Sequence, residues 1–308
     1  MARGVVPEDH PLCFGPTRVG TKQADVVLLI GTRLNYGLNF GRPGLFGENQ
    51  KWIQIDIEPT EVGRNRCIDV GIVGDARAVI EQIFDGVRDK TKARKTSPWI
   101  EECKAYFNNR QQQLEAEMNS DSVPIHPARL CKEIRDFIDR DAIIAMDGGD
   151  TTVWGAAVLK GYKPGHWLDN GPTGCLGVGV PFAVAAKVAY PDKQVVLLNG
   201  DGSFGLNGME FDTMIRHKLP VVCVICNDEA WGMIMHPQQA RGADRVVGTR
   251  LGFGRYDRMV EGLGGYGEAV EKPEDIRPAL KRAFASGLPA CVNVRCISIS
   301  RGSTIRRL

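Results

Sequence analysis

The sequence predicts an α/β protein built from two parallel-sheet domains. Three observations predict it: 308 residues suffice for two separate cores, short apolar runs alternate with segments of helical spacing, and a polar stretch divides them. Strands that alternate with helices form a parallel sheet. We expect the domains at residues 1–90 and 125–308, with residues 91–124 as a linker containing one amphipathic helix.

The expected elements follow in chain order. In the first domain, residues 24–34 and 51–59 are apolar runs stopped by Gly, Asn or Pro, and residues 75–90 have helical spacing. In the second domain, four β-rich runs alternate with helical patterns. The runs lie at 141–149, 194–202, 220–228 and 289–296, and the helical patterns at 127–138, 208–218 and 273–286.

Composition narrows the class of partner. Basic and acidic residues nearly balance, at 39 against 37, which argues against a nucleic-acid or membrane surface and favours a small-molecule ligand. The start "MARGVVPEDH" lacks the basic and apolar regions of an export signal, so we expect a soluble cytoplasmic chain. The nine cysteines are expected to be reduced and to pack, because Cys223 and Cys226 lie in an apolar run with no second pair at zinc-finger spacing.

Acidic and small residues end three neighbouring runs, at 147–150, 200–202 and 227–229. In open parallel sheets ligands bind beyond the carboxyl ends of the strands, so these turns should share one edge. Asp201 and Asp228 offer hard carboxylate oxygens that suit Mg²⁺, and the glycines let backbone amides approach a ligand. Because Mg²⁺ completes its octahedron with phosphate oxygens and water, the pattern predicts a bound phosphate compound.

Two common nucleotide motifs are not supported. The chain has no G-x-x-x-x-G-K-[ST] segment, which excludes a P-loop. "GLGGYG" at 262–267 matches a dinucleotide-binding pattern by letters, but no apolar strand precedes it and no clear helix follows.

"GDGS" followed by "ND", with Asp228 placed 27 positions after Asp201, resembles the cofactor motif of thiamine-diphosphate-dependent enzymes. The resemblance implies thiamine diphosphate and Mg²⁺ as cofactors. It also implies that the metal ligands are Asp201, the side chain of Asp228 and the carbonyl of Ala230. The family usually has Asn where Asp228 stands, so a second carboxylate here adds attraction for the cation and repulsion toward the diphosphate.

Other segments extend this resemblance over essentially the whole chain. "GCLGVGVPFAVAAKVA" resembles the glycine-rich segment of acetolactate synthases, where Leu176 would support the bent cofactor, and "DGGDTTVW" resembles the diphosphate-anchoring turn. Asn170 and His236 are candidate catalytic residues beside the substrate, His236 because imidazole titrates near neutral pH. The implied cofactor-binding residues are Gly149, Asp150, Thr151, Gly174, Leu176, Gly200, Gly202, Ser203, Gly232 and Met233.

Residues 210–232 and 238–251 look closest to the branch with benzaldehyde lyase, 2-hydroxyacyl-CoA lyase and oxalyl-CoA decarboxylase, and residues 24–76 resemble its central domain. The resemblance therefore implies a partial central domain, a C-terminal diphosphate domain and lyase or ligase activity on 2-hydroxyacyl-CoA or 2-hydroxyketone compounds. No segment resembles the pyrimidine-binding domain with its activating glutamate, so a second subunit in a hetero-oligomer with a dimeric core is expected, unless the chain is a fragment. The alternatives are a 2-oxo acid decarboxylase or acetolactate synthase subunit, and a catalytically silent regulatory subunit.

Overall fold

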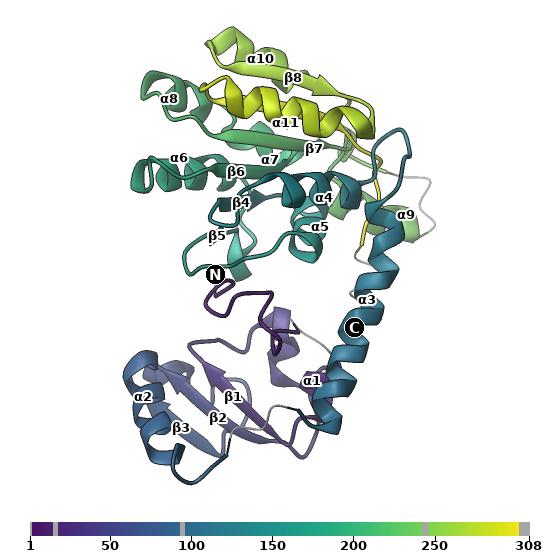
Figure 1. The fold of residues 1–308 in the computed structure, drawn as a ribbon. Coiled ribbons are helices and arrows are strands. Elements are labelled where there is room, and N and C mark those ends of the chain that lie inside the picture. The colour runs from purple at the N-terminus through teal and green to yellow at the C-terminus, as the bar shows by residue number, and fades with distance from the viewer. Residues whose placement is uncertain (1, 15–17, 93–95, 242–245, 302–308) are drawn as a thin grey trace. The chain divides into compact units, whose positions relative to one another are not determined.

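The computed structural model describes residues 2–14, 18–92, 96–241 and 246–301. The chain divides into two compact units (Figure 1). Within the described ranges, residues 14–111 form the small unit, and residues 2–13 together with 112–301 form the large unit. The N-terminal residues thus belong with the part of the chain that begins about a hundred positions later, a long-range link that no local pattern signals.

The small unit contains a three-stranded parallel sheet of β1 (Val26–Ile30), β2 (Lys51–Asp56) and β3 (Val70–Val73), in that order. A compact cluster around Trp52 and Phe46 packs at the sheet. Asp75 caps α2 (Ala76–Val87) by accepting a hydrogen bond from the Ala78 N–H. The other helical elements are α1 (Arg18–Gln23), η1 (Tyr36–Gly41), η2 (Pro59–Glu61) and α3 (Pro98–Met118), of which α3 continues into the large unit.

The large unit contains a six-stranded sheet in the order β5-β4-β6-β7-β9-β8, and every neighbouring pair is parallel. The central strands are fully buried, which explains why they read as continuous apolar runs. The strands are β4 (Ile143–Asp147), β5 (Trp167–Leu168), β6 (Val195–Gly200), β7 (Val222–Asn227), β8 (Tyr266–Val270) and β9 (Ala290–Arg295). The two parallel sheets confirm the predicted fold class.

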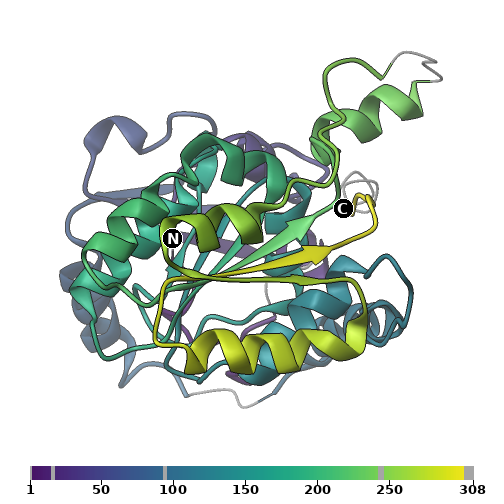
Figure 2. The same cartoon turned by 90° about the horizontal axis from the view of Figure 1, so that it is seen from above.

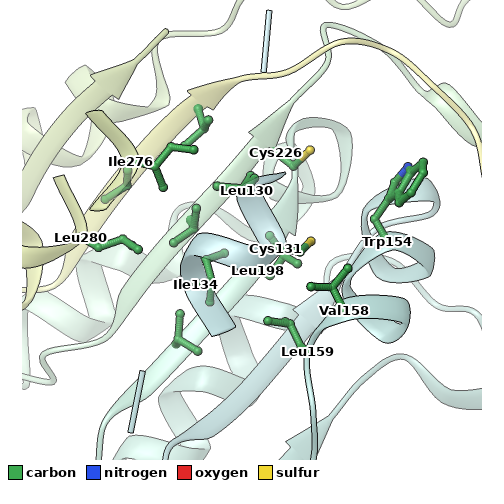
Figure 3. Packing of buried hydrophobic residues seen from close by; sticks show 14 of the residues in the cluster. Leu130, Cys131, Ile134, Trp154, Val158, Leu159, Leu198, Cys226, Ile276 and Leu280 are labelled. Carbon is green, nitrogen blue, oxygen red and sulfur yellow. The ribbon is translucent and has the colours of Figure 1, made fainter. Parts of the chain in front are cut away.

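Helices cover both faces of this sheet (Figures 1 and 2). On one face lie α4 (Pro127–Phe137), α5 (Asp150–Val158) and α11 (Ile276–Ala285). Figure 3 shows their apolar side chains, such as Leu130, Ile134 and Leu280, gathered in one core. On the other face lie α6 (Gly179–Ala189), α7 (Asp201–Asn207), α8 (Glu210–Arg216) and α10 (Tyr256–Leu263). The remaining helical elements are η3 (Gly171–Thr173), α9 (Gly232–Ala240) and η4 (Pro273–Asp275).

One helix of the large unit was not predicted from the sequence. The pattern at 208–218 corresponds to α8 (Glu210–Arg216), whereas α7 is a separate helix that starts at Asp201, directly after β6. The sequence did not predict α7 because the glycines of "GDGSFG" have low helix propensity. The acidic glycine turn is therefore itself the first turn of a helix.

All nine cysteines are free thiols, and six of them are buried, including Cys223 and Cys226. Burial raises the pKa of the Cys223 thiol, which keeps it protonated and unreactive. Across the described ranges, no helix is both long enough and apolar enough to traverse a bilayer.

Candidate functional site

The three acidic and glycine-rich turns lie along one edge of the large sheet. β4, β6 and β7 are adjacent and parallel, so the residues that follow them emerge at the same carboxyl edge. Contacts join the turns: the Ala230 N–H after β7 donates to Asp201 Oδ2 after β6 at 3.2 Å. A methyl group added to Gly200 would lie 3.1 Å from Thr151 Oγ1, after β4. The structure thus brings together residues from three segments that are far apart in sequence.

Asp201 and Asp228 form an acidic pair at this edge, in which Asp201 is buried and Asp228 is half-buried. Asp201 is 2% exposed, and its Oδ1 accepts a hydrogen bond from the Gly202 N–H at 2.8 Å. Burial, followed by the nearby charge of Asp228, raises the pKa of Asp201 to about 7. Burial also raises the pKa of Asp228, although its Oδ2 accepts a hydrogen bond from Ser298 Oγ at 2.7 Å. Two neighbouring carboxylates that are shielded from water and repel each other favour a shared cation.

Asp150 and His236 lie beside this pair. Asp150 Oδ1 accepts a hydrogen bond from Ser300 Oγ at 2.8 Å, whereas the buried Oδ2 has no hydrogen-bond partner among the described residues. His236 Nε2 is 3.5 Å from that Oδ2 atom. Burial raises the pKa of Asp150, and the hydrogen bond from Ser300 and the nearby His236 act in the opposite direction.

Gly232 lets these groups converge. A methyl group added there would lie 2.8 Å from Asp150 Oδ2 and 2.9 Å from Asp228 Oδ2, closer than real Cβ contacts. Any larger residue would separate the two carboxyl groups. Position 232 thus requires glycine for close approach of side chains.

Two further glycines of the predicted set serve as packing surfaces. A methyl group on Gly202 would lie 2.7 Å from the Trp231 ring, and one on Gly149 would lie 2.8 Å from Met233 Cβ. Met233 is 42% exposed, so it remains available for a ligand at this edge. Ser203 Oγ is already engaged, donating to the Gly200 carbonyl at 3.0 Å in a fully buried position.

Residues 170–176 form a separate segment with local hydrogen bonds. The Asn170 carbonyl accepts a hydrogen bond from Thr173 Oγ1, and the Asn170 side chain does not cap η3. Gly174 has φ 64° and is exposed, with nothing within 4 Å of an added methyl group, while Leu176 is half-buried. Asn207 at the end of α7 links this segment to the acidic edge by donating to the Gly177 carbonyl.

The donor set fits a hard divalent cation completed by ligand oxygens. Across the described ranges, no group of three or more His, Cys, Asp and Glu side chains is arranged to hold a metal. The metal ligands predicted from the sequence are a different kind of group, because they are the two carboxylates of Asp201 and Asp228 and the backbone carbonyl of Ala230. The bridge between Ala230 and Arg250 uses the Glu229 carbonyl and the Trp231 N–H, which leaves the Ala230 carbonyl outside it. Oxygens from phosphate and water would have to complete the coordination of Mg²⁺.

Sequence reasoning missed three polar residues at this edge. Ser298 and Ser300, in the segment after β9, donate to Asp228 and Asp150. Asn199 is fully buried at the end of β6, and its Nδ2 has no hydrogen-bond partner among the described residues. The position of Asn199 one residue before "GDG" was a usable signal, because polar residues at the end of a buried strand face the ligand edge. No local pattern in "SIS", residues 298–300, indicates the contacts that Ser298 and Ser300 make.

Comparison with known proteins agrees with this arrangement. Residues 147–294 match the thiamine pyrophosphate enzyme C-terminal TPP-binding domain, and residues 1–83 match the thiamine pyrophosphate enzyme central domain. The chain is 43% identical over 297 residues to acetolactate synthase large subunit IlvG of Mycobacterium tuberculosis. It is 34% identical over 309 residues to 2-hydroxyacyl-CoA lyase of Oryza sativa and 30% identical over 311 residues to 2-hydroxyacyl-CoA lyase 1 of Homo sapiens.

Each of these alignments covers 96% of this chain but only 53 or 54% of the relative. The chain therefore spans about half the length of the curated relatives it matches. No family model for an N-terminal domain matches it, in agreement with the absence of a pyrimidine-domain signature in the sequence. The matched models, the two parallel-sheet domains and these relatives together show that the chain belongs to the thiamine-pyrophosphate-dependent enzymes, of which it contains central and C-terminal TPP-binding domain sequence.

Proposed function

We propose that the large unit binds the diphosphate of thiamine diphosphate through Mg²⁺, held by Asp201, Asp228 and the carbonyl of Ala230. The observation that carries the proposal is the Asp201–Asp228 pair, in which Asp201 is buried, Asp228 is half-buried and the pKa of Asp201 is raised to about 7. Burial is the larger cause of this raised pKa and the charge of Asp228 the second, and a divalent cation would offset both by balancing the charge of the ionised carboxylates. When bound, thiamine diphosphate supplies the nucleophilic carbon for making or breaking a carbon–carbon bond beside a carbonyl.

The chain's own residues then act by holding and orienting. The Ala230 N–H fixes one oxygen of Asp201 at 3.2 Å and leaves the carboxylate's remaining electron pairs for the cation. Gly149, Gly200, Thr151 and the partly exposed Met233 would form the cofactor surface, while Gly202 and Ser203 maintain its packing. Gly174 and Leu176 would reach the cofactor from the segment before α6.

His236 is the proposed proton carrier. Its Nε2 lies 3.5 Å from the partner-free oxygen of Asp150, so the two groups can share a proton at that atom. Asn170 is the proposed polar contact for substrate, on the other segment.

The small unit and the large unit would correspond to a partial central domain and the diphosphate domain. The glutamate that activates the cofactor ring would come from a further polypeptide or chain region, in an assembly with a dimeric core. The proposal rests on the 53% coverage of the relatives and on the absence of an N-terminal family match. In this account the chain alone binds the cofactor but does not turn over substrate.

Two reactions are candidates, both at a carbonyl. The first reaction is cleavage or formation of 2-hydroxyacyl compounds, and it is supported by the resemblance of residues 212–220 and 238–251 to the lyase branch. Positions 242–245 lie outside the described residues. The higher identity to a relative named acetolactate synthase, 43% against 34%, favours condensation of 2-oxo acids. The completed enzyme should be assayed with pyruvate alone, with 2-hydroxyacyl-CoA and with aldehydes. Formation of acetolactate from pyruvate alone would support the second reaction, the condensation of 2-oxo acids.

Cofactor binding tests the core of the proposal. Asp201→Asn should weaken thiamine diphosphate binding at saturating Mg²⁺ by about a hundredfold, because a charge-assisted metal contact is lost. The matched control is Asp192→Asn, an exposed aspartate of the same unit, which should bind as the unaltered chain does. Calorimetric titration with and without Mg²⁺ gives both affinities. Equal affinity of the two variants would overturn the proposed metal site, and an assembled enzyme that keeps its activity with Asp201→Asn would favour the silent-subunit alternative.

A further inference from the structure

A cavity of about 150 Å³ lies in the large unit, at the opposite end of β4 from the candidate site. Its wall comes from the end of α4, the amino end of β4 and the chain that joins α5 to β5; Figure 1 shows these elements. Ile144 of β4 lines the cavity, so roughly 10 Å of strand separates it from Asp147 at the carboxyl edge. The cavity is thus distinct from the acidic edge.

The lining carries net positive charge. Arg135, Arg140 and Lys160 line the cavity against one carboxylate, that of Asp139. Arg135 and Arg140 have carboxylate partners of their own, each at 2.7 Å, in Asp136 and Asp9. No described residue forms an ion pair with Lys160. The Asp9 carboxylate, which pairs with Arg140, also interacts with the charge of Lys160. An anion that enters the cavity would be attracted to this ammonium group, which no described carboxylate contacts directly.

His166 provides a second, independent indication of a ligand. It is 7% exposed and lines the cavity, and its Nδ1 atom has no hydrogen-bond partner among the described residues. The nearby Asp141 Oδ1 is 3.7 Å from Nδ1, too far for a hydrogen bond, and Asp141 is already bound by Lys163 and Lys193. Leaving a buried polar atom without a partner is destabilising, and a ligand that accepts a hydrogen bond there would recover the lost free energy.

The remaining wall is apolar and fixes the size of the ligand. Ile144 and Leu159 are 3% and 1% exposed, and the Tyr162 ring is held 4.0 Å beneath the Arg140 guanidinium. A cavity of about this volume accommodates a molecule of benzene's size. We infer that the cavity binds a small organic carboxylate of about six heavy atoms, with its charge at Lys160 and His166 and its hydrocarbon part against Ile144 and Leu159.

Butanoate, butanamide and inorganic phosphate are suitable probes, used with the full chain in ligand-observed NMR titrations and without thiamine diphosphate. Butanoate should bind saturably with a dissociation constant of about 1 mM, as expected for a ligand of this size. Lys160→Gln should weaken its binding about tenfold, and His166→Phe should weaken it similarly by removing the ring nitrogen. Lys281→Gln, which removes an exposed lysine from α11, is the charge-matched control and should leave the affinity unchanged.

Butanamide lacks the charge and should bind at least about tenfold more weakly than butanoate. The inference is overturned by equal binding of butanoate and butanamide, by phosphate binding as tightly as butanoate, or by the absence of saturation. It is also overturned when Lys160→Gln and Lys281→Gln have the same effect. If His166→Phe fails to fold, the comparison of butanoate with butanamide and the comparison of Lys160→Gln with Lys281→Gln still test the inference. None of these results depends on whether the thiamine diphosphate proposal holds.

Discussion

At the scale of single residues, the acidic edge depends on how closely side chains can approach. Asp150 and Asp228 converge because Gly232 has no side chain between them, and Trp231 covers Gly202 at contact distance. The site is therefore sensitive to additions of one methyl group. Asp228 stands where the family usually has Asn, and this departure explains part of the raised pKa of Asp201.

A pair of glycine substitutions in α7 tests this packing. Gly202→Ala would place Cβ 2.7 Å from the Trp231 ring and should reduce the free energy of unfolding by about 1–3 kcal/mol. Gly205→Ala, in the same helix, meets nothing within 4 Å and should be neutral or stabilise by up to about 1 kcal/mol. Urea unfolding measures both, and an equal effect of the two substitutions would show that Trp231 does not pack as described.

At the scale of elements, α4 begins with an unusual cap. His126 is 7% exposed, and its Nδ1 accepts a hydrogen bond from the Ala128 N–H at 3.1 Å. Burial lowers the pKa of His126 below its usual value. A protonated Nδ1 could not accept this bond, so helix capping and protonation exclude each other.

This cap predicts a pH dependence of stability. Below about pH 6.5 the unfolded chain takes up the proton first, so the free energy of unfolding should fall as the pH drops through that value. His126→Asn keeps an acceptor at the cap but does not titrate. The free energy of unfolding of the unaltered chain, relative to that of His126→Asn, should be smaller near pH 5.5 than near pH 7.5 when both are measured by urea unfolding. A difference that stays constant or grows at the lower pH would contradict the lowered pKa.

The β1 strand of the small unit shows the two-residue alternation of a half-exposed sheet. Leu28 is 45% exposed, whereas Leu29 is 7% exposed and packs in the cluster with Trp52. Leu29→Ala should therefore cost about 2–4 kcal/mol, and Leu28→Ala about 1 kcal/mol or less. Hydrogen exchange of the β2 amides reports the opening of this unit alone. Equal losses of exchange protection in the two variants would contradict the assignment of Leu29 to the buried face of the sheet and of Leu28 to the exposed face.

The elements also show what the sequence could predict. β4, β6, β7 and β9 were predictable because buried parallel strands read as apolar runs. β5 and β8 were not, because β5 has two residues and β8, "YGEAV", includes Gly and Glu at a sheet edge. Ser298 and Ser300 were not predictable either, since their contacts depend on where the chain runs after β9.

At the scale of the whole molecule, the acidic edge and the basic cavity lie at opposite ends of the same sheet. The chain matches about half of each relative, so its activity depends in this account on a further domain. Mixing the chain with a separately produced pyrimidine-binding domain of a relative should produce turnover that neither part shows alone. Turnover by the isolated chain would contradict the assignment of the activating glutamate to another region.

The central claim is that the carboxyl groups of positions 201 and 228 share one divalent cation. A crystal structure of the chain grown with thiamine diphosphate and Mn²⁺, in which anomalous scattering identifies the metal, tests it most directly. The account predicts one metal peak about 2.0–2.3 Å from an oxygen of Asp201, an oxygen of Asp228 and the Ala230 carbonyl, in contact with the diphosphate. A diphosphate bound elsewhere, or a metal that contacts neither aspartate, would contradict it.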